Sequence, residues 1–426
     1  PDGLSFTFEG TRTAELNDPT DLLSLKTLTE IQTINGRTTT NVYDAATRTV
    51  TTTSHAGRQA VATFDEAGRI TGAQMGDLAP MAVTYDAFGR PDHLTMGTGD
   101  RIESILLGYD PDTGYPASFT DPLGETWYFL RDMAGRTTSL IRPDLEETGT
   151  AYDANGNIVS ITPPGTAPHQ FTYNASNTLA SYSPPEVNGT PMPVGYGYTN
   201  DAVLDTITRA DGGIIDLDYD PVCGCLSSIT WPGTTGATTF AYEAATGMLG
   251  SITAPDGESL ALSYDGFLPN QFIWSGTING AVDLGYDTDL RVSELGVQVG
   301  ADQRSWAYLY GDADGLLTQA GDLTMTRDPV DGFLTGTTIG LVTTAQSHNG
   351  YGELALLSAN YDTTRLYEAE FLEHDALGRV LRIRETVEGV AQTKRYVYDE
   401  AGRLDQVWID ESLYVDYDYD SNGNRT

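Results

Sequence analysis

Lysine is almost absent from this 426-residue chain, where it occurs only at Lys26 and Lys394. The other 21 of the 23 basic residues are arginine, and 60 acidic residues oppose them, so the formal net charge is −37. A surface this acidic repels phosphate, and we therefore expect no nucleic-acid partner. The charge suits a secreted protein or one from a salty environment.

Long apolar segments are absent as well. No stretch approaches the roughly 20 residues that a membrane-spanning helix requires, so no membrane span is expected. The N-terminus, PDGLSFTFEG, has no basic flank, apolar signal region or initial methionine. We therefore expect a mature protein or an internal piece of a longer one. The catalytic signatures GxSxG, HExxH, the P-loop and GxGxxG are also missing, which disfavours an enzyme of those classes.

One short motif is abundant instead. Tyr-Asp-x-x-Gly-Arg/Asn appears eighteen times between residues 43 and 419 when weaker copies are included, at a mean interval of about 22 residues. The clear copies are FDEAGR from residue 64, YDAFGR from 85, YDANGN from 152, HDALGR from 374, YDEAGR from 398 and YDSNGN from 419. The high content of glycine and aspartate is therefore largely a product of one repeated turn, and much of the −37 charge follows from it.

Each copy of the motif predicts a β-hairpin. Alternating runs such as SLALSYD precede the turn and runs such as GRLDQVWI follow it, which is the period-2 pattern of strands. The aspartate side chain can accept from backbone N–H groups of the turn, and the glycine supplies the positive φ of a type I turn with a bulge. One tyrosine per repeat at a fixed register predicts a stripe of stacked rings on one face.

The repeats together predict a single very large sheet. Two strands per repeat give roughly 36 strands, and open twisted sheets seldom exceed ~10 without curling. At ~4.8 Å per strand the sheet is about 170 Å long, and rolled once it closes a ring roughly 55 Å across. The expected fold class is all-β, with tandem β-hairpin repeats forming one curled, spiralling β-sheet shell or cocoon around a hollow. We expect residues 1–40 to be an atypical start or a degenerate repeat, and residues 41–426 to be one continuous shell within a longer protein.

The motifs YDAFGR, YDANGN and YDEAGR, with the longer segment FTDPLGETWYFLRDMAGR, resemble the YD repeats of the rearrangement-hotspot (Rhs) family. The resemblance covers nearly the whole chain from residue 40 onwards. It implies a spiralling β-shell, which in toxin complexes encloses a toxic C-terminal segment. In bacterial surface proteins and teneurins it implies an extracellular scaffold for adhesion, so the resemblance predicts a secreted or cell-surface, bacterial extracellular location. An enclosed toxin segment or an extracellular polysaccharide or glycan is therefore the expected partner.

Residues that depart from the repeat's own consensus are the candidates for chemistry. His348 and His374 occupy the tyrosine position of consecutive repeats, and Tyr351, Arg379 and Glu373 are close in sequence. These side chains could supply a base, an acid and a cation to a polysaccharide lyase or hydrolase. The alternative is an aromatic stripe that tolerates imidazole, with no catalytic role.

Two further departures suggest metal chemistry. Cys223 and Cys225 are the only cysteines and flank a glycine in YDPVCGCL; such a pair can form a local disulfide, remain as two thiols, bind a soft metal or serve in redox chemistry. Asp312 and Asp314 in GDADG suggest Ca²⁺, although they do not match the calcium-loop pattern and a solvated turn is the alternative. No other cofactor is expected.

Three functions remain open on the sequence. The preferred one is a non-catalytic extracellular β-shell scaffold, for toxin encapsulation or surface adhesion. The second is a secreted polysaccharide-binding protein or lyase that uses the concave cavity of the shell. The third is an assembly subunit whose exposed edge strands pair with neighbouring copies.

Overall fold

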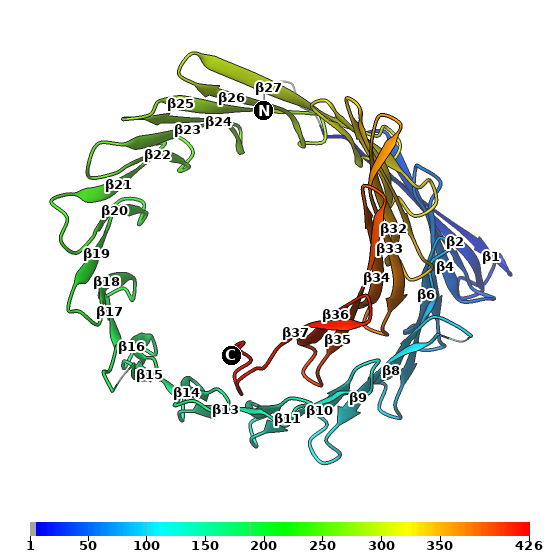
Figure 1. Cartoon of the computed structure of the whole chain (residues 1–426), viewed down its shortest axis with the longest axis horizontal. Helices are drawn as coiled ribbons and strands as arrows, with labels where there is room; N and C mark the ends of the chain where they lie inside the picture. Colours follow the sequence, from blue (N-terminus) through cyan, green and yellow to red (C-terminus); the bar gives the residue numbers. More distant parts are fainter. Residues whose placement is uncertain (1–5, 100, 188) are drawn as a thin grey trace.

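The computed structural model describes residues 6–99, 101–187 and 189–426. In these ranges the chain forms 37 strands of one sheet, each paired antiparallel with the next (Figure 1). No helix in the described part of the chain is long and apolar enough to cross a membrane. The all-β spiralling sheet predicted from the repeat is confirmed, with close to the expected number of strands.

The first half of the strands are β1 (Phe8–Leu16), β2 (Leu25–Ile34), β3 (Arg37–Asp44), β4 (Thr49–Thr53), β5 (Gln59–Phe64), β6 (Ile70–Met75), β7 (Met81–Tyr85), β8 (Pro91–Met96), β9 (Glu103–Tyr109), β10 (Pro116–Thr120), β11 (Thr126–Arg131), β12 (Thr137–Ile141), β13 (Glu147–Tyr152), β14 (Ile158–Thr162), β15 (His169–Tyr173), β16 (Leu179–Ser183), β17 (Val194–Tyr198) and β18 (Leu204–Thr208).

The second half are β19 (Ile214–Tyr219), β20 (Leu226–Thr230), β21 (Ala237–Tyr242), β22 (Leu249–Thr253), β23 (Ser259–Asp265), β24 (Leu268–Ser275), β25 (Gly280–Tyr286), β26 (Val292–Val299), β27 (Asp302–Tyr310), β28 (Leu317–Ala320), β29 (Leu323–Arg327), β30 (Leu334–Ile339), β31 (Val342–His348), β32 (Leu354–Tyr361), β33 (Thr364–His374), β34 (Val380–Val387), β35 (Val390–Tyr398), β36 (Leu404–Ile409) and β37 (Ser412–Asp416). The first two strands, which lie within residues 1–40, belong to the same sheet as the rest.

The repeated turn has the geometry that its sequence predicts. After β5, Asp65 Oδ1 accepts the backbone N–H groups of Ala67 and Arg69, each at 2.9 Å. Gly68 has a φ of 78°, a conformation that glycine adopts without steric cost. The pairing register shifts at Phe64, which marks the bulge. The same register shift recurs in every Tyr-Asp-type hairpin from β5–β6 to β35–β36, but not in β3–β4. Because a bulge bends its strand and increases the local twist, this repetition favours a curled sheet.

The predicted stripe of stacked tyrosine rings is wrong. The Tyr85 hydroxyl donates to the Ile70 carbonyl at 2.6 Å, and the Arg69 guanidinium lies 4.3 Å from the centroid of the Tyr85 ring. Among the residues that the structure describes, no ring pair joins two of these tyrosines. Consecutive tyrosines stand two strands, or about 10 Å, apart, which exceeds the reach of a ring pair, so an arginine fills the gap.

The rung position is the residue just before the one whose carbonyl accepts the hydroxyl of the next repeat's tyrosine, as Arg69 precedes Ile70. It usually follows the turn glycine, and an arginine there bridges its own repeat to that tyrosine. Arginine occupies it beneath six tyrosines, at 4.0–4.7 Å from the ring centroid, in the pairs Arg69–Tyr85, Arg90–Tyr109, Arg136–Tyr152, Arg291–Tyr310, Arg379–Tyr398 and Arg403–Tyr419. One rung is inverted: Tyr115 takes the rung position and Arg131 takes the tyrosine position. Arg131 Nε donates to the Pro116 carbonyl at 3.1 Å, as a tyrosine hydroxyl does elsewhere.

The sheet winds past one full turn, so that strands distant in sequence lie side by side. Asn35 Nδ2 donates to the Thr288 carbonyl 253 residues later, and Arg58 Nη2 lies 2.8 Å from Asp314 Oδ2, 256 residues later. Figure 1 shows β32–β37 alongside the early strands. The estimate of a ring rolled once is therefore wrong. That estimate spread all the strands around one circumference, whereas strand twist and the recurring bulges curve the sheet more tightly.

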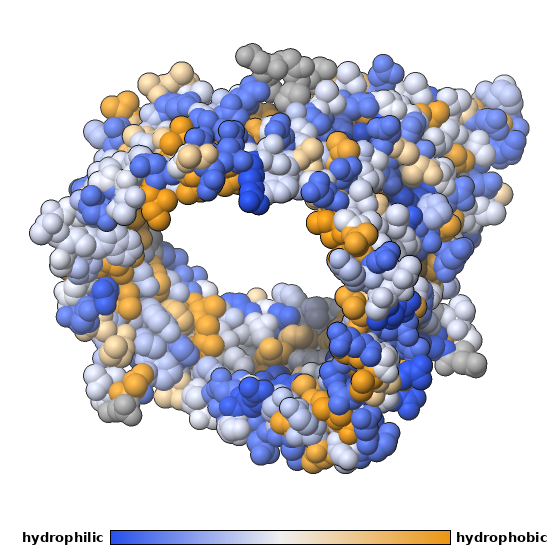
Figure 2. Space-filling model, turned by 45° about the horizontal axis from the view of Figure 1, so that its top comes forward, coloured by the Kyte–Doolittle hydropathy of each residue, from blue (hydrophilic) through white to orange (hydrophobic). Residues whose placement is uncertain are grey.

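Little of this wall is sealed from solvent. In the described ranges, and apart from proline and glycine, the only apolar residues that are more than nine-tenths buried are Ala369, at 0% exposed, and Ile383, at 7%. The strand face that carries the tyrosines also carries leucine, isoleucine and phenylalanine, as in Leu260, Leu262 and Tyr264 of β23. Figure 2 shows apolar side chains on the wall of the ring's opening. Contacts within the sheet and along its overlapping edges therefore replace a closed core.

Candidate functional site: a polar cluster at the seam

The seam is the line where the second turn of the spiral meets the first. Hairpins that join an even-numbered strand to the next odd one in the first turn meet Tyr-Asp-type hairpins of the second turn. Four arginines of the first turn donate across it, in the contacts Arg37–Asp289 at 2.5 Å, Arg58–Asp314 at 2.8 Å, Arg101–Glu353 at 2.7 Å and Arg142 to the Ser421 carbonyl at 2.9 Å. Two edges of the same sheet are therefore joined by three arginine–carboxylate pairs and one arginine–carbonyl hydrogen bond.

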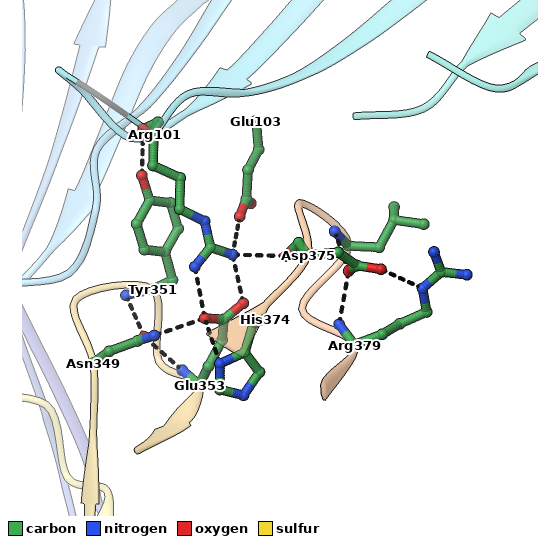
Figure 3. Close-up of polar contacts among 9 residues, drawn as sticks. Arg101, Glu103, Asn349, Tyr351, Glu353, His374, Asp375 and Arg379 are labelled. Carbon is green, nitrogen blue, oxygen red and sulfur yellow. Dashed lines mark hydrogen bonds and ion pairs between the residues drawn. The ribbon is translucent and has the colours of Figure 1, made fainter. Parts of the chain in front are cut away.

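The most connected part of the seam surrounds Arg101, in the segment between β8 and β9 (Figure 3). Its two terminal nitrogens contact both carboxylate oxygens of Glu353, at 2.9 and 2.7 Å. Nη2 also donates to Glu103 at 2.5 Å and to the Asp375 carbonyl at 3.0 Å. A guanidinium with a planar fork of donors suits this bidentate contact.

The local sequence explains why Glu353 can receive an arginine from the other turn. In HNGYGE, asparagine stands where the repeat has aspartate, and Glu353 stands at the rung position, where six other repeats have arginine. Asn349 Oδ1 accepts the backbone N–H of Tyr351 at 2.9 Å and keeps the turn intact. Asn349 Nδ2 donates to Glu353 at 2.6 Å. This turn therefore has a neutral residue and an anion where an ordinary repeat has an anion and a cation, and Arg101 supplies the missing cation.

Tyr351 and His374 complete the cluster. The Tyr351 hydroxyl donates to the Arg101 carbonyl, and its ring lies 4.1 Å from the Arg101 guanidinium. His374 Nδ1 lies 3.6 Å from Glu353 Oε2, and the histidine side chain is only 6% exposed. No polar atom of the cluster is among the buried side-chain atoms without a hydrogen-bond partner in the described ranges. The cluster is therefore internally satisfied.

These contacts favour the ionised forms of Glu353 and Arg101. Burial would raise the pKa of the Glu353 carboxyl, but hydrogen bonds from Arg101 and Asn349 outweigh it and lower the pKa below its usual value. The hydrogen bond to Glu353 raises the pKa of Arg101, against the opposing effect of burial. The pair therefore stays ionised at neutral pH and acts as an electrostatic contact rather than as an acid or base.

The comparisons with known proteins agree with this architecture. The sequence profile described as Teneurin YD-shell matches residues 11–426. The chain belongs to the teneurin YD-shell family. The resemblance to YD repeats inferred from the motifs is thereby confirmed.

This YD shell is 24% identical to Teneurin-4 of Homo sapiens over 379 residues, which is 81% of the chain and 13% of the relative. It is 23% identical to Teneurin-3 of Danio rerio over 360 residues, 82% of the chain and 13% of the relative. The chain thus spans only a small part of the length of these relatives.

Two solved structures match the chain at low similarity. The crystal structure of TcdB2-TccC3-TEV is 13% identical with a TM-score of 0.37, over 91% of this chain and 27% of that one. The Photorhabdus luminescens Tc holotoxin pore is 12% identical with a TM-score of 0.38, over 91% and 27%.

The YD shell brings together only part of the predicted catalytic set. Tyr351 and His374 join the seam cluster, whereas Arg379 is a rung residue with Nε 2.6 Å from Asp375 Oδ2 and its guanidinium 4.2 Å from the Tyr398 ring. His348 stays outside the cluster and packs its ring 4.7 Å from that of Phe333. Glu373 lies 3.7 Å from Arg382 at the surface. This arrangement favours the scaffold role over the catalytic one for these residues.

The predicted metal candidates have other partners in the YD shell. Cys223 and Cys225 are joined in a disulfide, so neither thiolate is available to a metal. Asp314 belongs to the seam, where Arg58 neutralises it, and Asp312 is exposed. In the described ranges no three His, Cys, Asp or Glu side chains are placed to hold a metal ion. Ca²⁺ binding at these aspartates stays a prediction without a supporting ligand set.

Sequence reasoning missed the residues that hold the seam. Arg58, Arg101 and Arg142 are not in rung positions, and Glu353 replaces an arginine in one. Both departures from the repeat were visible in the sequence. Their pairing was not, because it depends on how many repeats complete one turn of the spiral.

Proposed function

We propose that this chain is a non-catalytic shell scaffold that holds an extended polypeptide segment against its inner wall. The observation that carries the proposal is the seam, where arginine–carboxylate contacts between residues more than 250 apart lock the curled sheet into a ring with an apolar wall. A ring locked in this way encloses space without needing a catalytic group. An enclosed toxin segment and an extracellular location both accord with such a shell.

Labelled peptides test this directly. Three synthetic peptides of equal length, in which leucine alternates with arginine, serine or glutamate, are titrated with the purified chain and followed by fluorescence anisotropy. We expect at least one to bind, and we expect the seam double variant Arg58→Met/Arg101→Met to lose that binding as the ring opens. Failure of all three peptides to bind, or equal binding by the seam variant, would contradict the proposal.

A second candidate function, polysaccharide binding, has one observation in its favour. The rings of Phe171 and His169 lie 5.2 and 5.9 Å from that of Tyr182, and His169 Nδ1 lies 2.7 Å from the Tyr182 hydroxyl. They line an open cavity of about 490 Å³ together with Tyr196. Aromatic faces with a few polar atoms suit a sugar ring.

Affinity electrophoresis in gels that contain acidic or neutral polysaccharides tests this candidate. Retardation that Tyr182→Ala abolishes, and that Tyr414→Ala at an exposed position leaves unchanged, would support it. Absorbance from new double bonds, measured on the same polysaccharides, would reveal a lyase. We expect none, because Tyr351 and His374 are occupied at the seam.

A further inference from the structure

The arc from β13 to β25 differs from the rest of the ring in its charge. Residues 143–286 contain sixteen acidic residues and a single lysine or arginine, Arg209. From β16 onwards these strands lie in a single layer in Figure 1, away from the second turn. At the start of the arc, Asp144 lies at the seam, 3.1 Å from Arg142 and 3.7 Å from Arg403. Arg209 lies 2.9 Å from Asp211 and is itself about half exposed. The arc is therefore strongly anionic and lacks an internal supply of cations.

The arc has no arginine at its rung positions. Across this arc the rung positions hold Asn157, Thr178, Val203, Cys225, Met248 and Leu268. The tyrosines that follow still donate to the strand before them, as Tyr242 does to the Leu226 carbonyl at 3.0 Å and Tyr264 to the Leu249 carbonyl at 2.8 Å. The hydrogen bonds that join each tyrosine to the preceding hairpin are thus preserved, and only the guanidinium groups at the rung positions are absent.

Other rungs show what a cation would meet at such a position. Arg90 Nε lies 2.7 Å from Asp86 Oδ2, its guanidinium lies 4.1 Å from the Tyr109 ring, and Nη1 donates to the Gly114 carbonyl at 2.9 Å. A carboxylate, a ring face and a carbonyl oxygen converge on one guanidinium. This is the chemistry that recognises arginine.

The same groups stand without a cation within the arc. Asp220 and Glu243, the acidic residues of two of its turns, have no arginine or lysine partner among the described residues. At the rung position Thr178, the hydroxyl oxygen is buried with no hydrogen-bond partner in the described ranges. The tyrosine face here also offers apolar contacts, including Phe171 and Leu179.

We propose that the tyrosine face of β13–β25 binds a cationic polypeptide segment in which arginines alternate with apolar residues. Its guanidinium groups occupy, from outside the chain, the rung positions that Arg69, Arg90 and Arg136 fill within it. The acidic field of the arc attracts such a segment, and the apolar face accommodates its uncharged side chains. This inference rests on the proposed function and specifies which polypeptide the shell holds.

The three alternating peptides test the inference separately from the shell function. We expect the leucine–arginine peptide to bind most tightly and to weaken as salt is raised. If all three peptides bind equally, the inference is overturned while the shell proposal stands. If none binds, the shell proposal fails as well.

Paired variants test the position of the site. Val203→Arg/Met248→Arg places guanidinium groups at two empty rungs, and Thr239→Arg/Ala261→Arg adds the same charge on the opposite face of the sheet. Occupying two rungs should weaken binding of the leucine–arginine peptide roughly tenfold, against about twofold for the control. Equal weakening by both pairs would show a general charge effect and overturn the inference. Urea midpoints are measured for each variant, and Val203→Arg alone, at a 40% exposed position, repeats the test if the double variant does not fold.

Discussion

Glu353 occupies a rung position, where six other repeats have arginine, and it binds the guanidinium of Arg101, 252 residues earlier in the chain. In an ordinary repeat the aspartate and the arginine of one turn pair with each other, as Asp65 and Arg69 do at 2.7 Å. With glutamate in place of that arginine, the turn has no internal pair, and its carboxylate instead accepts from an arginine in another part of the sheet. A local reversal of charge thus becomes a contact between two turns of the spiral.

Removing the Arg101 charge should destabilise the ring. Arg101→Met keeps the aliphatic stem but leaves Glu353, which is 11% exposed, and Glu103, which is 8% exposed, without their cation. Breaking a largely buried pair in this way costs about 2–3 kcal/mol, given that the arginine itself is partly exposed. The free energy of unfolding in urea measures the loss.

A matched surface pair provides the control for that variant. Arg12 lies 3.1 Å from Glu30 but is 69% exposed, so Arg12→Met should change the free energy of unfolding by less than about 0.5 kcal/mol. Small-angle scattering should show an expanded particle for Arg101→Met alone. Equal effects of the two substitutions would mean that the seam contributes no more than a surface ion pair.

Stability should fall in acid because of the seam carboxylates. The folded-state pKa of Glu353 lies below its usual value, so the carboxyl is harder to protonate in the folded chain than in the unfolded one. Its contribution is complete above the unfolded pKa of about 4.3 and is lost as the pH falls through the lower folded value. Glu353→Gln should therefore be less stable at pH 7 but lose less stability between about pH 5 and pH 2.

Urea midpoints measured across that pH range compare the two chains. Glu66→Gln, at a carboxylate that is 85% exposed, serves as the control and should follow the unsubstituted chain at every pH. Parallel curves for the unsubstituted chain and Glu353→Gln would show that this carboxylate does not contribute to acid unfolding.

The disulfide should contribute little to the stability of the shell. Cys223 and Cys225 are two residues apart, so the bond closes a very short loop and removes little freedom from the unfolded chain. Reduction, or the Cys223→Ser/Cys225→Ser variant, should lower the free energy of unfolding by less than about 2 kcal/mol. A larger loss would show that this turn organises more of the sheet than its own hairpin.

The sequence predicts the hairpin and the fold class but not the contacts between turns. The bulged turn at Asp65 and Gly68 follows from local chemistry, because aspartate and glycine act within five residues. The role of Arg69 was missed, because a tyrosine in every repeat suggested stacked rings. Tyrosines two strands apart are too far from each other to stack, and the arginine fills the space between them. Arg101 and Glu353 could not be paired, since that pairing depends on the curvature accumulated over more than 250 residues.

Loss of a single tyrosine hydroxyl should loosen one repeat and leave distant ones unaffected. In Tyr242→Phe the ring stays but the Leu226 carbonyl loses its donor at 3.0 Å, which should cost about 1 kcal/mol. Because each strand contacts mainly its neighbours, amide exchange should accelerate in β20–β22 and stay unchanged in β30–β33. Tyr414→Phe, at a ring that is 72% exposed, should change neither region. Uniform acceleration of amide exchange along the whole chain would instead mean that the ring unfolds as one unit. The hydrogen bonds from tyrosine to the preceding strand would then not stabilise individual repeats.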